Sequence, residues 1–282
     1  MMNETDFCAF ILTHGRPDRV YTYDTLRRCG YTGRIVIVID DEDKTADEYY
    51  ENFDEVVMFS KKEVASKIDE GDNFGDRRAI IYARNACFDI ARDLGVKYFI
   101  QLDDDYVEFR HKRDAENNYI DKRMKDFDAV MDAMLDYYKS IPALSIAMAQ
   151  GGDFVGGKNG KSWHKPKRKC MNSFICSTDR PFKFFGRINE DVNTYANLGS
   201  RGGLFLTTVN VALQQKQTQT NEGGMTGLYL DSGTYVKSFY SIMYQPSSVK
   251  ISILPSKNGR IHHKVKWRYT VPCIVSDEHK KQ

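Results

Sequence analysis

Short runs of apolar residues recur through the first half of the chain. β-branched residues are common in these runs, and their length is that of buried strands. The runs cover residues 7–12, 35–39, 97–102 and 143–149. The segments between them carry apolar residues at intervals of three and four, the spacing of amphipathic helices. Strands that alternate with helices in this order predict a parallel sheet covered by helices.

Three helices are expected between these strands. The first follows Pro17, which suits the first position of a helix, and ends at Gly30. The second covers residues 79–94 and ends at Gly95, and the third covers residues 124–138. The Met and aromatic side chains of the third helix are expected to pack in the core.

The second half of the chain differs from the first in composition and in the length of its apolar runs. A glycine-rich segment follows Ala149, and a basic segment comes after it. Shorter strands are expected in the segments "SFICS", "GLFLTT" and "VKISIL". Neither a tandem repeat nor a clean linker is visible, so we expect one α/β domain over residues 1–282. Its central sheet is mostly parallel and flanked by helices, and its second half is less regular and mixed.

Composition places the chain among globular cytoplasmic proteins. Hydrophobic residues make up 41% and charged residues 28% of the 282 residues, and the net charge is +2. The longest apolar runs are far too short to span a bilayer, and the first residues lack the pattern of a signal peptide. Six cysteines are scattered without a CxxC pair, so we expect reduced, buried thiols.

Polar side chains follow three successive strands of the predicted sheet. They are Thr13, His14 and Arg16 after the first strand, Asp40 and Asp41 after the second, and Asp103, Asp104 and Asp105 after the third. Ligands of parallel sheets bind beyond the carboxyl ends of the strands. The sequence therefore predicts a site at this edge.

The three adjacent carboxylates require a positive partner, because like charges repel and burial raises their pKa values. Mg²⁺ or Mn²⁺ is the expected partner, since hard cations prefer oxygen ligands and bridge carboxylates to phosphates. In a strand or tight turn, Asp103 and Asp105 point the same way and Asp104 points to the other side. An acidic turn exposed to water is the alternative, and the motif alone does not exclude it.

A basic run lies between residues 158 and 169 and contains no acidic residue. Its cations are Lys158, Lys161, Lys165, Lys167, Arg168 and Lys169. A second strip surrounds Trp267 and consists of Lys257, Arg260, Lys264, Lys266 and Arg268. Both suit contacts with phosphates, although a solvated, mobile loop has the same composition.

The order of these motifs resembles a GT-A glycosyltransferase. The motifs on which this resemblance rests are the "THGR" turn, "VIVIDDED", the Arg-Asn of "YARNACFDIA", "LDDD", the glycine-rich segment after Gln150, the Asn-Glu-Asp of "RINEDVNTY" and the histidines of "GRIHHKVKW". They extend from Phe7 to Lys264. More narrowly, "SFICSTDRPFKFFGRINEDVNTY" resembles the TET/JBP-associated glycosyltransferases, which are found in phages and linked to sugar addition on oxidised bases in DNA.

The resemblance implies roles for residues that would bind the donor. Thr13 and Arg16 would lie against the nucleotide diphosphate and base, Asp40 would bind the nucleoside, and Arg84 would contact the donor phosphates. Asp103 and Asp105 would hold the metal together with His262 or His263, and Asp104 would join the nucleotide-sugar site. The sequence does not say which histidine faces the metal.

The resemblance also implies the catalytic and acceptor residues. Asp191 would be the general base that takes the proton of the acceptor hydroxyl, and Glu190 would contact donor or acceptor. The basic run would contact DNA phosphates, and Trp163 and His164 within it would stack on an extruded base or wedge beside it. Each motif has a simpler interpretation: an acid pair at a helix start for Glu190 and Asp191, exposed strand residues for the histidines, and a surface arginine for Arg84.

The implied activity is a metal-dependent transfer of a hexose or pentose from a nucleotide sugar, such as UDP-glucose, to 5-hydroxymethylcytosine in double-stranded phage DNA. Residues 1–110 would bind the nucleotide sugar, and residues 111–282 would bind the acceptor and carry the catalytic residues. The expected location is the cytoplasm of the phage's host, without a membrane partner. A polysaccharide or protein acceptor, nucleotidyl transfer, and a non-catalytic nucleic-acid-binding module remain as alternatives.

Overall fold

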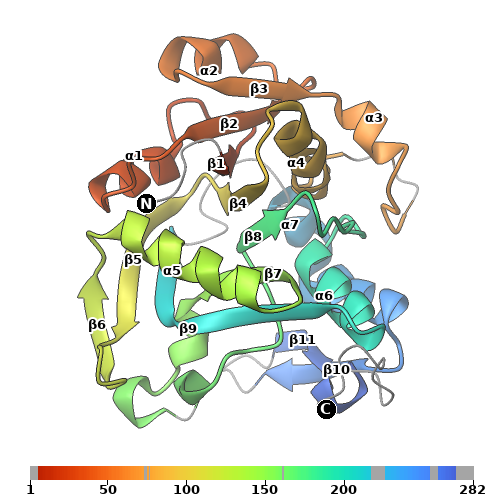
Figure 1. The fold of residues 1–282 in the computed structure, drawn as a ribbon. Helices are drawn as coiled ribbons and strands as arrows, with labels where there is room; N and C mark the ends of the chain where they lie inside the picture. The colour runs from red at the N-terminus through yellow and green to blue at the C-terminus, as the bar shows by residue number, and fades with distance from the viewer. Residues whose placement is uncertain are drawn as a thin grey trace.

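A mixed sheet of nine strands organises the structure, which is a computed structural model (Figure 1). It describes residues 6–72, 75, 77–160, 162–216, 226–254 and 260–270. The strands of the main sheet are β1 (Phe7–Leu12), β2 (Ile35–Asp40), β3 (Val56–Phe59), β4 (Tyr98–Asp103), β5 (Tyr106–Arg113), β6 (Tyr119–Arg123), β7 (Ala143–Ala149), β8 (Ser173–Ser177) and β9 (Leu204–Gln215). Their order across the sheet is β3-β2-β1-β4-β8-β7-β9-β5-β6.

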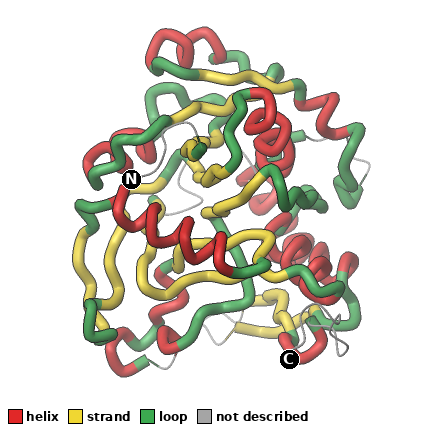
Figure 2. Tube along the Cα trace, in the orientation of Figure 1, coloured by secondary structure: helices red, strands yellow, loops and turns green. Residues whose placement is uncertain are grey.

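Helices and a second, two-stranded sheet make up the other secondary structure of the described residues (Figure 2). The helices are α1 (Tyr21–Arg28), α2 (Ala46–Asn52), α3 (Lys61–Ala65), α4 (Ile81–Asp93), α5 (Phe127–Ser140), α6 (Glu190–Ser200) and α7 (Thr226–Tyr244). The short 3₁₀ helices are η1 (Gly151–Phe154), η2 (Gly157–Asn159), η3 (Ser162–His164) and η4 (Trp267–Tyr269). Strands β10 (Val249–Leu254) and β11 (Arg260–Val265) form an antiparallel hairpin that packs against α7.

The first four strands of the sheet order are parallel, as expected. Leu12 at the end of β1 is paired with Val38 of β2 and with Asp103 of β4, so the three strands end at the same edge. Beyond β4 the sheet is mixed, because β8 runs antiparallel to both β4 and β7. This confirms the expected α/β class, with a mostly parallel first half of the sheet and a mixed second half.

Both faces of the sheet are covered, and the side chains of β1 show how. Phe7, Ala9 and Ile11 pack in one apolar cluster with α1 and α5, whereas the alternate residues pack in another with α4 and α6. Helix α5 crosses the near side of the sheet in Figure 1. Strands buried on both sides explain the continuous apolar runs of the sequence.

The helix ends partly follow the predictions. Gly30 and Gly95 follow α1 and α4 with φ of 89° and 68°, the left-handed conformation that ends a helix, so these predictions are confirmed. The prediction that Pro17 begins α1 is wrong, because the helix starts at Tyr21. Helix α5 starts at Phe127, after Met124, which is buried before the helix begins.

The cysteines described, Cys8, Cys29, Cys87, Cys170 and Cys176, are buried free thiols, as expected. Cys273 lies outside the described residues. Within the part of the chain that the structure describes, no helix combines the length and apolar character that crossing a bilayer requires.

Candidate active site

Two of the carboxylates at the end of β4, Asp103 and Asp104, have cationic partners within the protein. Arg84 of α4 contacts Asp103, with Nη2 2.9 Å from Oδ1. Asp104 points elsewhere: Oδ2 accepts a hydrogen bond from Thr13 Oγ1 at 2.7 Å and lies 3.1 Å from Nη2 of Arg16. The turn after β1 and the turn after β4 therefore meet, as the strand order predicted.

Asp104 and Asp105 hold their protons more tightly than ordinary carboxyls. Burial raises the pKa of Asp104 to about 6, against the opposing effect of Arg16 and Thr13. Burial, together with the charges of Asp103 and Asp104, raises the pKa of Asp105 to about 7. The Asp105 carboxylate is contacted only at long range by Nε2 of Gln215 among the hydrogen bonds of the described side chains, at 3.4 Å from Oδ1. A cation placed here would relieve this repulsion.

Asp40 ends β2 at the same edge and is engaged by the protein. Nζ of Lys61 lies 2.9 Å from its Oδ1, and Nδ1 of His14 lies 2.8 Å from its Oδ2. Burial alone would raise the pKa of Asp40, but the hydrogen bonds from His14 and Lys61 hold it below its ordinary value. Sequence reasoning missed Lys61, because nothing local marks a lysine at the start of a short helix as a buried counter-ion.

Tyr49 of α2 is a second residue that the sequence did not indicate. Its hydroxyl accepts a hydrogen bond from the backbone N–H of Arg16 at 2.8 Å and lies 3.0 Å from Thr13 Oγ1. Asp43 Oδ2 accepts from the backbone N–H of Gly15 at 2.6 Å. These contacts fix the turn after β1 beneath the predicted nucleotide site.

Arg84 is not a surface arginine. Only 2% of its surface is exposed, and its guanidinium lies 4.6 Å from the ring centre of Phe174. Besides Asp103, it contacts Glu190, with Nε 3.1 Å from Oε1. Burial opposes the charge, but Asp103 and Glu190 raise the pKa of Arg84, so it stays protonated. Its burial disagrees with a direct contact to donor phosphates; Arg84 instead joins the two acidic motifs.

Glu190 and Asp191 form the first turn of α6 and are not a solvated acid pair. Asp191 is 9% exposed, and Glu190 is directed towards Arg84. Burial and the charge of Asp191 raise the pKa of Glu190 to about 7, and burial raises the pKa of Asp191 as well. A carboxylate with a raised pKa is suited to accept a proton near neutral pH.

His263 reaches this motif from β11. It is 9% exposed, and its Nδ1 lies 3.3 Å from the side-chain nitrogen of Asn189, the residue before Glu190. Its ring centre lies 4.2 Å from that of His262. Burial, with the nearby His262 and Lys237, lowers the pKa of His263 to about 3, so the ring is neutral.

The carboxylates fit a divalent cation better than the histidines do. Among the described residues, no group of three His, Cys, Asp or Glu side chains is arranged to hold a metal. Asp103 and Asp105 still offer hard oxygen donors at one turn, and such cations often take one or two carboxylates plus phosphate oxygens of the substrate. His263 fits poorly, because its Nδ1 faces Asn189.

The basic run forms a surface of short 3₁₀ turns. Lys158, Lys165 and Arg168 are exposed, and Lys167 is half-buried. Lys169 is half-buried and forms an ion pair with Asp153 at 2.7 Å, so its charge is balanced within the protein. Lys161 lies outside the described residues.

Trp163 disagrees with the expected stacking on a base. It is 7% exposed and packs on Tyr119, with ring centres 5.4 Å apart, and beneath the guanidinium of Arg113 at 5.1 Å. The exposed ring of His164 also stacks on it, with centres 4.1 Å apart. Trp163 therefore anchors the loop by packing against the protein. In a sequence, an aromatic ring in a basic run looks the same whether it is buried or stacks on a base.

The second basic strip lies beside the first. Nη2 of Arg168 donates to the backbone oxygen of Trp267 at 3.3 Å, and the guanidinium lies 5.7 Å from its indole. Trp267 in turn stacks on Tyr195 of α6, with ring centres 5.7 Å apart. Lys257 lies outside the described residues. A basic surface thus leads to the helix that carries Glu190 and Asp191.

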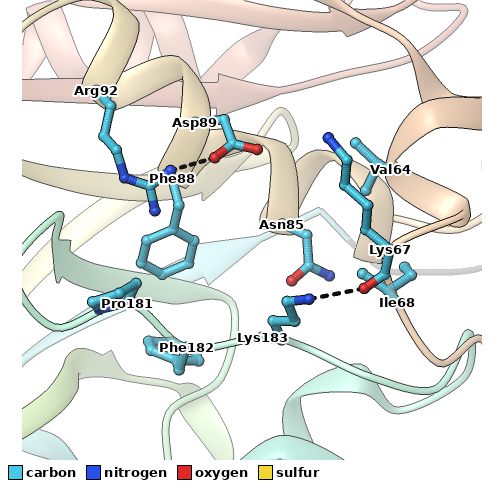
Figure 3. Close-up of a pocket in the computed structure, with 10 residues that line it drawn as sticks. All are labelled: Val64, Lys67, Ile68, Asn85, Phe88, Asp89, Arg92, Pro181, Phe182 and Lys183. Atoms are coloured by element: carbon cyan, nitrogen blue, oxygen red, sulfur yellow. Dashed lines mark hydrogen bonds and ion pairs between the residues drawn. The ribbon is translucent and has the colours of Figure 1, made fainter.

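A pocket of about 480 Å³ lies apart from these residues, between α3, the outer side of α4 and residues 181–183 (Figure 3). Phe88 and Phe182 are among its apolar lining residues. Two cations that line it are already paired, Lys67 with Glu63 at 2.5 Å and Arg92 with Asp89. None of the predicted site residues lines this pocket.

Residues 7–224 match the family of TET-associated glycosyltransferases. The chain belongs to this family. The matched range contains the carboxylates of β4, Arg84, the acid pair of α6 and the basic run. It ends before α7 and before the hairpin that carries His262 and His263.

The chain is also similar to a solved structure, the crystal structure of S. aureus TarS 1-349. The identity is 12% and the TM-score is 0.39, and the alignment covers 74% of this chain and 59% of that chain. The chain thus spans less than two thirds of the structure that it matches. A search of curated proteins found no match.

Proposed function

We propose that this chain transfers a sugar from a nucleotide sugar, UDP-glucose or a similar donor, to the hydroxymethyl group of 5-hydroxymethylcytosine in DNA. One observation carries the proposal. In this chain, a member of the TET-associated glycosyltransferases, the buried Arg84 joins Asp103 at the end of β4 to Glu190 at the start of α6. Donor and acceptor groups of a transferase must meet, and Arg84 holds the two motifs in contact.

The donor would lie at the edge formed by β1, β2 and β4. Arg16 is placed beside Asp104, with 28% of its side chain exposed, and can contact the diphosphate as charge develops on it. Asp103 and Asp105 would hold Mn²⁺ or Mg²⁺. Such a cation, when bound, stabilises the negative charge of the leaving nucleoside diphosphate.

Asp191 is the proposed general base. Its raised pKa supports proton transfer from a hydroxymethyl group, which is a poor acid. Glu190, oriented by Arg84, would contact the donor or acceptor. Direct attack by the deprotonated oxygen on the anomeric carbon would break its bond to the diphosphate and invert the configuration there.

The basic surface supports DNA as the acceptor. Lys158, Lys165 and Arg168 are exposed and would contact phosphates, which position the duplex without reading its sequence. The contact of Arg168 with Trp267 adds Lys264, Lys266 and Arg268 to the same region. A target base must leave the stack to reach buried carboxylates.

Mass spectrometry of nucleosides tests this proposal. Duplex DNA with 5-hydroxymethylcytosine is incubated with the protein, Mn²⁺ and separate UDP-, GDP- and TDP-sugars, then digested. We expect the mass of one glycosylated nucleoside with one of the donors and none with unmodified cytosine. A sugar found on added polysaccharide or protein, and never on DNA, would favour the alternative acceptors.

A further inference from the structure

The turn before α6 has an unusual backbone. Asn189, which precedes Glu190, has φ of 56°, in the left-handed region, and is 7% exposed. Asparagine tolerates this conformation better than most residues, but it still requires surrounding contacts to hold it. The orientation of the acid pair therefore depends on what fixes Asn189.

The side-chain amide of Asn189 is attached to two elements far along the chain. Its Nδ2 donates to the backbone oxygen of Lys237 at 2.7 Å and lies 3.2 Å from Oγ of Ser241, both on α7. It also lies 3.3 Å from Nδ1 of His263 on β11. One amide thus connects the start of α6 to α7 and to the hairpin.

The other contacts of the Asn189 amide determine which atom donates and which accepts in the contact with His263. A backbone carbonyl can only accept, so the short contact with Lys237 identifies the nitrogen end of the amide. The two N–H groups of this nitrogen serve the Lys237 oxygen and, between them, Ser241 Oγ and His263 Nδ1. Because the amide nitrogen cannot accept, Nδ1 is the acceptor in the contact with His263. In the neutral ring the proton is then on Nε2, which leaves no lone pair for a cation.

A second attachment fixes the same turn from the other side. The backbone N–H of Gly186 donates to the oxygen of Asp69 at 2.7 Å. Arg187 forms an ion pair with Asp72 at 2.8 Å, and the hydroxyl of Tyr240 on α7 donates to the same carboxylate. Helix α7 thus contacts the turn through both Asn189 and Asp72.

We propose that Asn189 is a positioning residue, which holds Glu190 and Asp191 in place by tying the start of α6 to α7 and His263. Both partners lie beyond residue 224, where the family match ends. His263 accordingly supports the acid pair through Asn189 and is not a metal ligand. The kinetic part of this inference rests on the proposed function.

Asn189→Gly tests the role of the amide alone, because glycine adopts a positive φ without strain. Misplacing a reacting group by about 1 Å can cost on the order of 100-fold. We expect kcat on hydroxymethylated duplex to fall by about that factor, with the KM for UDP-glucose within about twofold of wild type. Hydrogen exchange should become faster in peptides covering residues 189–193.

Asn117→Gly is the matched control, since Asn117 has φ of 68° in the exposed turn between β5 and β6. It should leave both kcat and exchange at residues 189–193 unchanged. An Asn189→Gly protein that matches Asn117→Gly in both measurements overturns the proposal. If the wild type glycosylates no DNA, the proposed function fails, and the exchange comparison still decides whether the amide anchors the turn.

Two substitutions of His263 separate anchoring from metal binding. The amide oxygen of His263→Asn lies near the former Nδ1 and can accept from Asn189, whereas that of His263→Gln lies near the former Nε2. We expect His263→Asn to retain more kcat than His263→Gln, at the same Mn²⁺ dependence. The reverse order, with a higher Mn²⁺ requirement for His263→Asn, would contradict the proposal.

Discussion

Arg84 brings a guanidinium group to a position that is almost completely buried, against the ring of Phe174. A buried charge persists only with partners, and its partners are Asp103 and Glu190, which belong to different motifs. One side chain therefore holds the end of β4 against the start of α6, the proposed donor and acceptor sides of the site. It also supplies a positive partner that the carboxylates of β4 require.

Arg84→Met should be strongly destabilising. Removing one partner of a buried ion pair leaves uncompensated charge, which typically costs about 3–5 kcal/mol. Urea unfolding measures the free energy of unfolding of each variant. Arg92→Met is the control on the same helix: its pair with Asp89 is exposed and should contribute within about 1 kcal/mol. Equal losses of stability in the two variants would show that Arg84 is not a buried counter-ion.

The lowered pKa of Asp40 makes the free energy of unfolding depend on pH. Its folded pKa is lowered below the ordinary value of 3.8, so it stabilises the fold above that pH. The contribution is lost as pH falls through the folded pKa. We expect the difference in unfolding free energy between wild type and Asp40→Asn to be constant from pH 7 to roughly pH 5 and to shrink below roughly pH 4. A difference that does not change down to pH 3 would contradict the pairing with Lys61 and His14.

At the scale of elements, residues 151–169 form three short 3₁₀ turns held by Trp163 and by the pair of Lys169 with Asp153. These anchors leave Lys158, Lys165 and Arg168 on the surface. The loop can therefore present charge without becoming part of the core.

The double variant Lys158→Ala, Lys165→Ala tests this surface. If each lysine neutralises one phosphate, the slope of log KM for DNA against log salt concentration should become shallower by about 1.8. The KM for the donor should not change. Lys44→Ala with Lys62→Ala removes two exposed lysines near α2 and α3 and should leave the slope unaltered. The loop has no role in DNA binding if the two double variants behave alike.

Elements that depend on local pattern were predictable from the sequence. β1, β7 and β8 coincide with the apolar runs at residues 7–12, 143–149 and 173–177, because such strands are buried on both faces. The β5–β6 hairpin was missed, since its exposed residues break the apolar pattern. The burial of Trp163 was not predicted, because the sequence does not show that Tyr119 and Arg113 pack against its ring.

At the scale of the molecule, the edge that gathers the carboxylates followed from strand order, but their partners did not. β8, which comes late in the chain, inserts between β4 and β7. It brings Phe174 against Arg84 and carries the chain to Glu190. Such pairings join residues about a hundred positions apart, and no local signal specifies them. The link from Asn189 to His263 is hidden for the same reason.

The most direct test of the central claim is the release of UDP from UDP-glucose in the presence of Mn²⁺. The account predicts rapid release with 5-hydroxymethylcytosine duplex and only slow release with unmodified duplex. Asp191→Asn should abolish the difference while still binding UDP in a calorimetric titration. Equal release with both duplexes, or an Asp191→Asn protein with near-normal turnover, would contradict it.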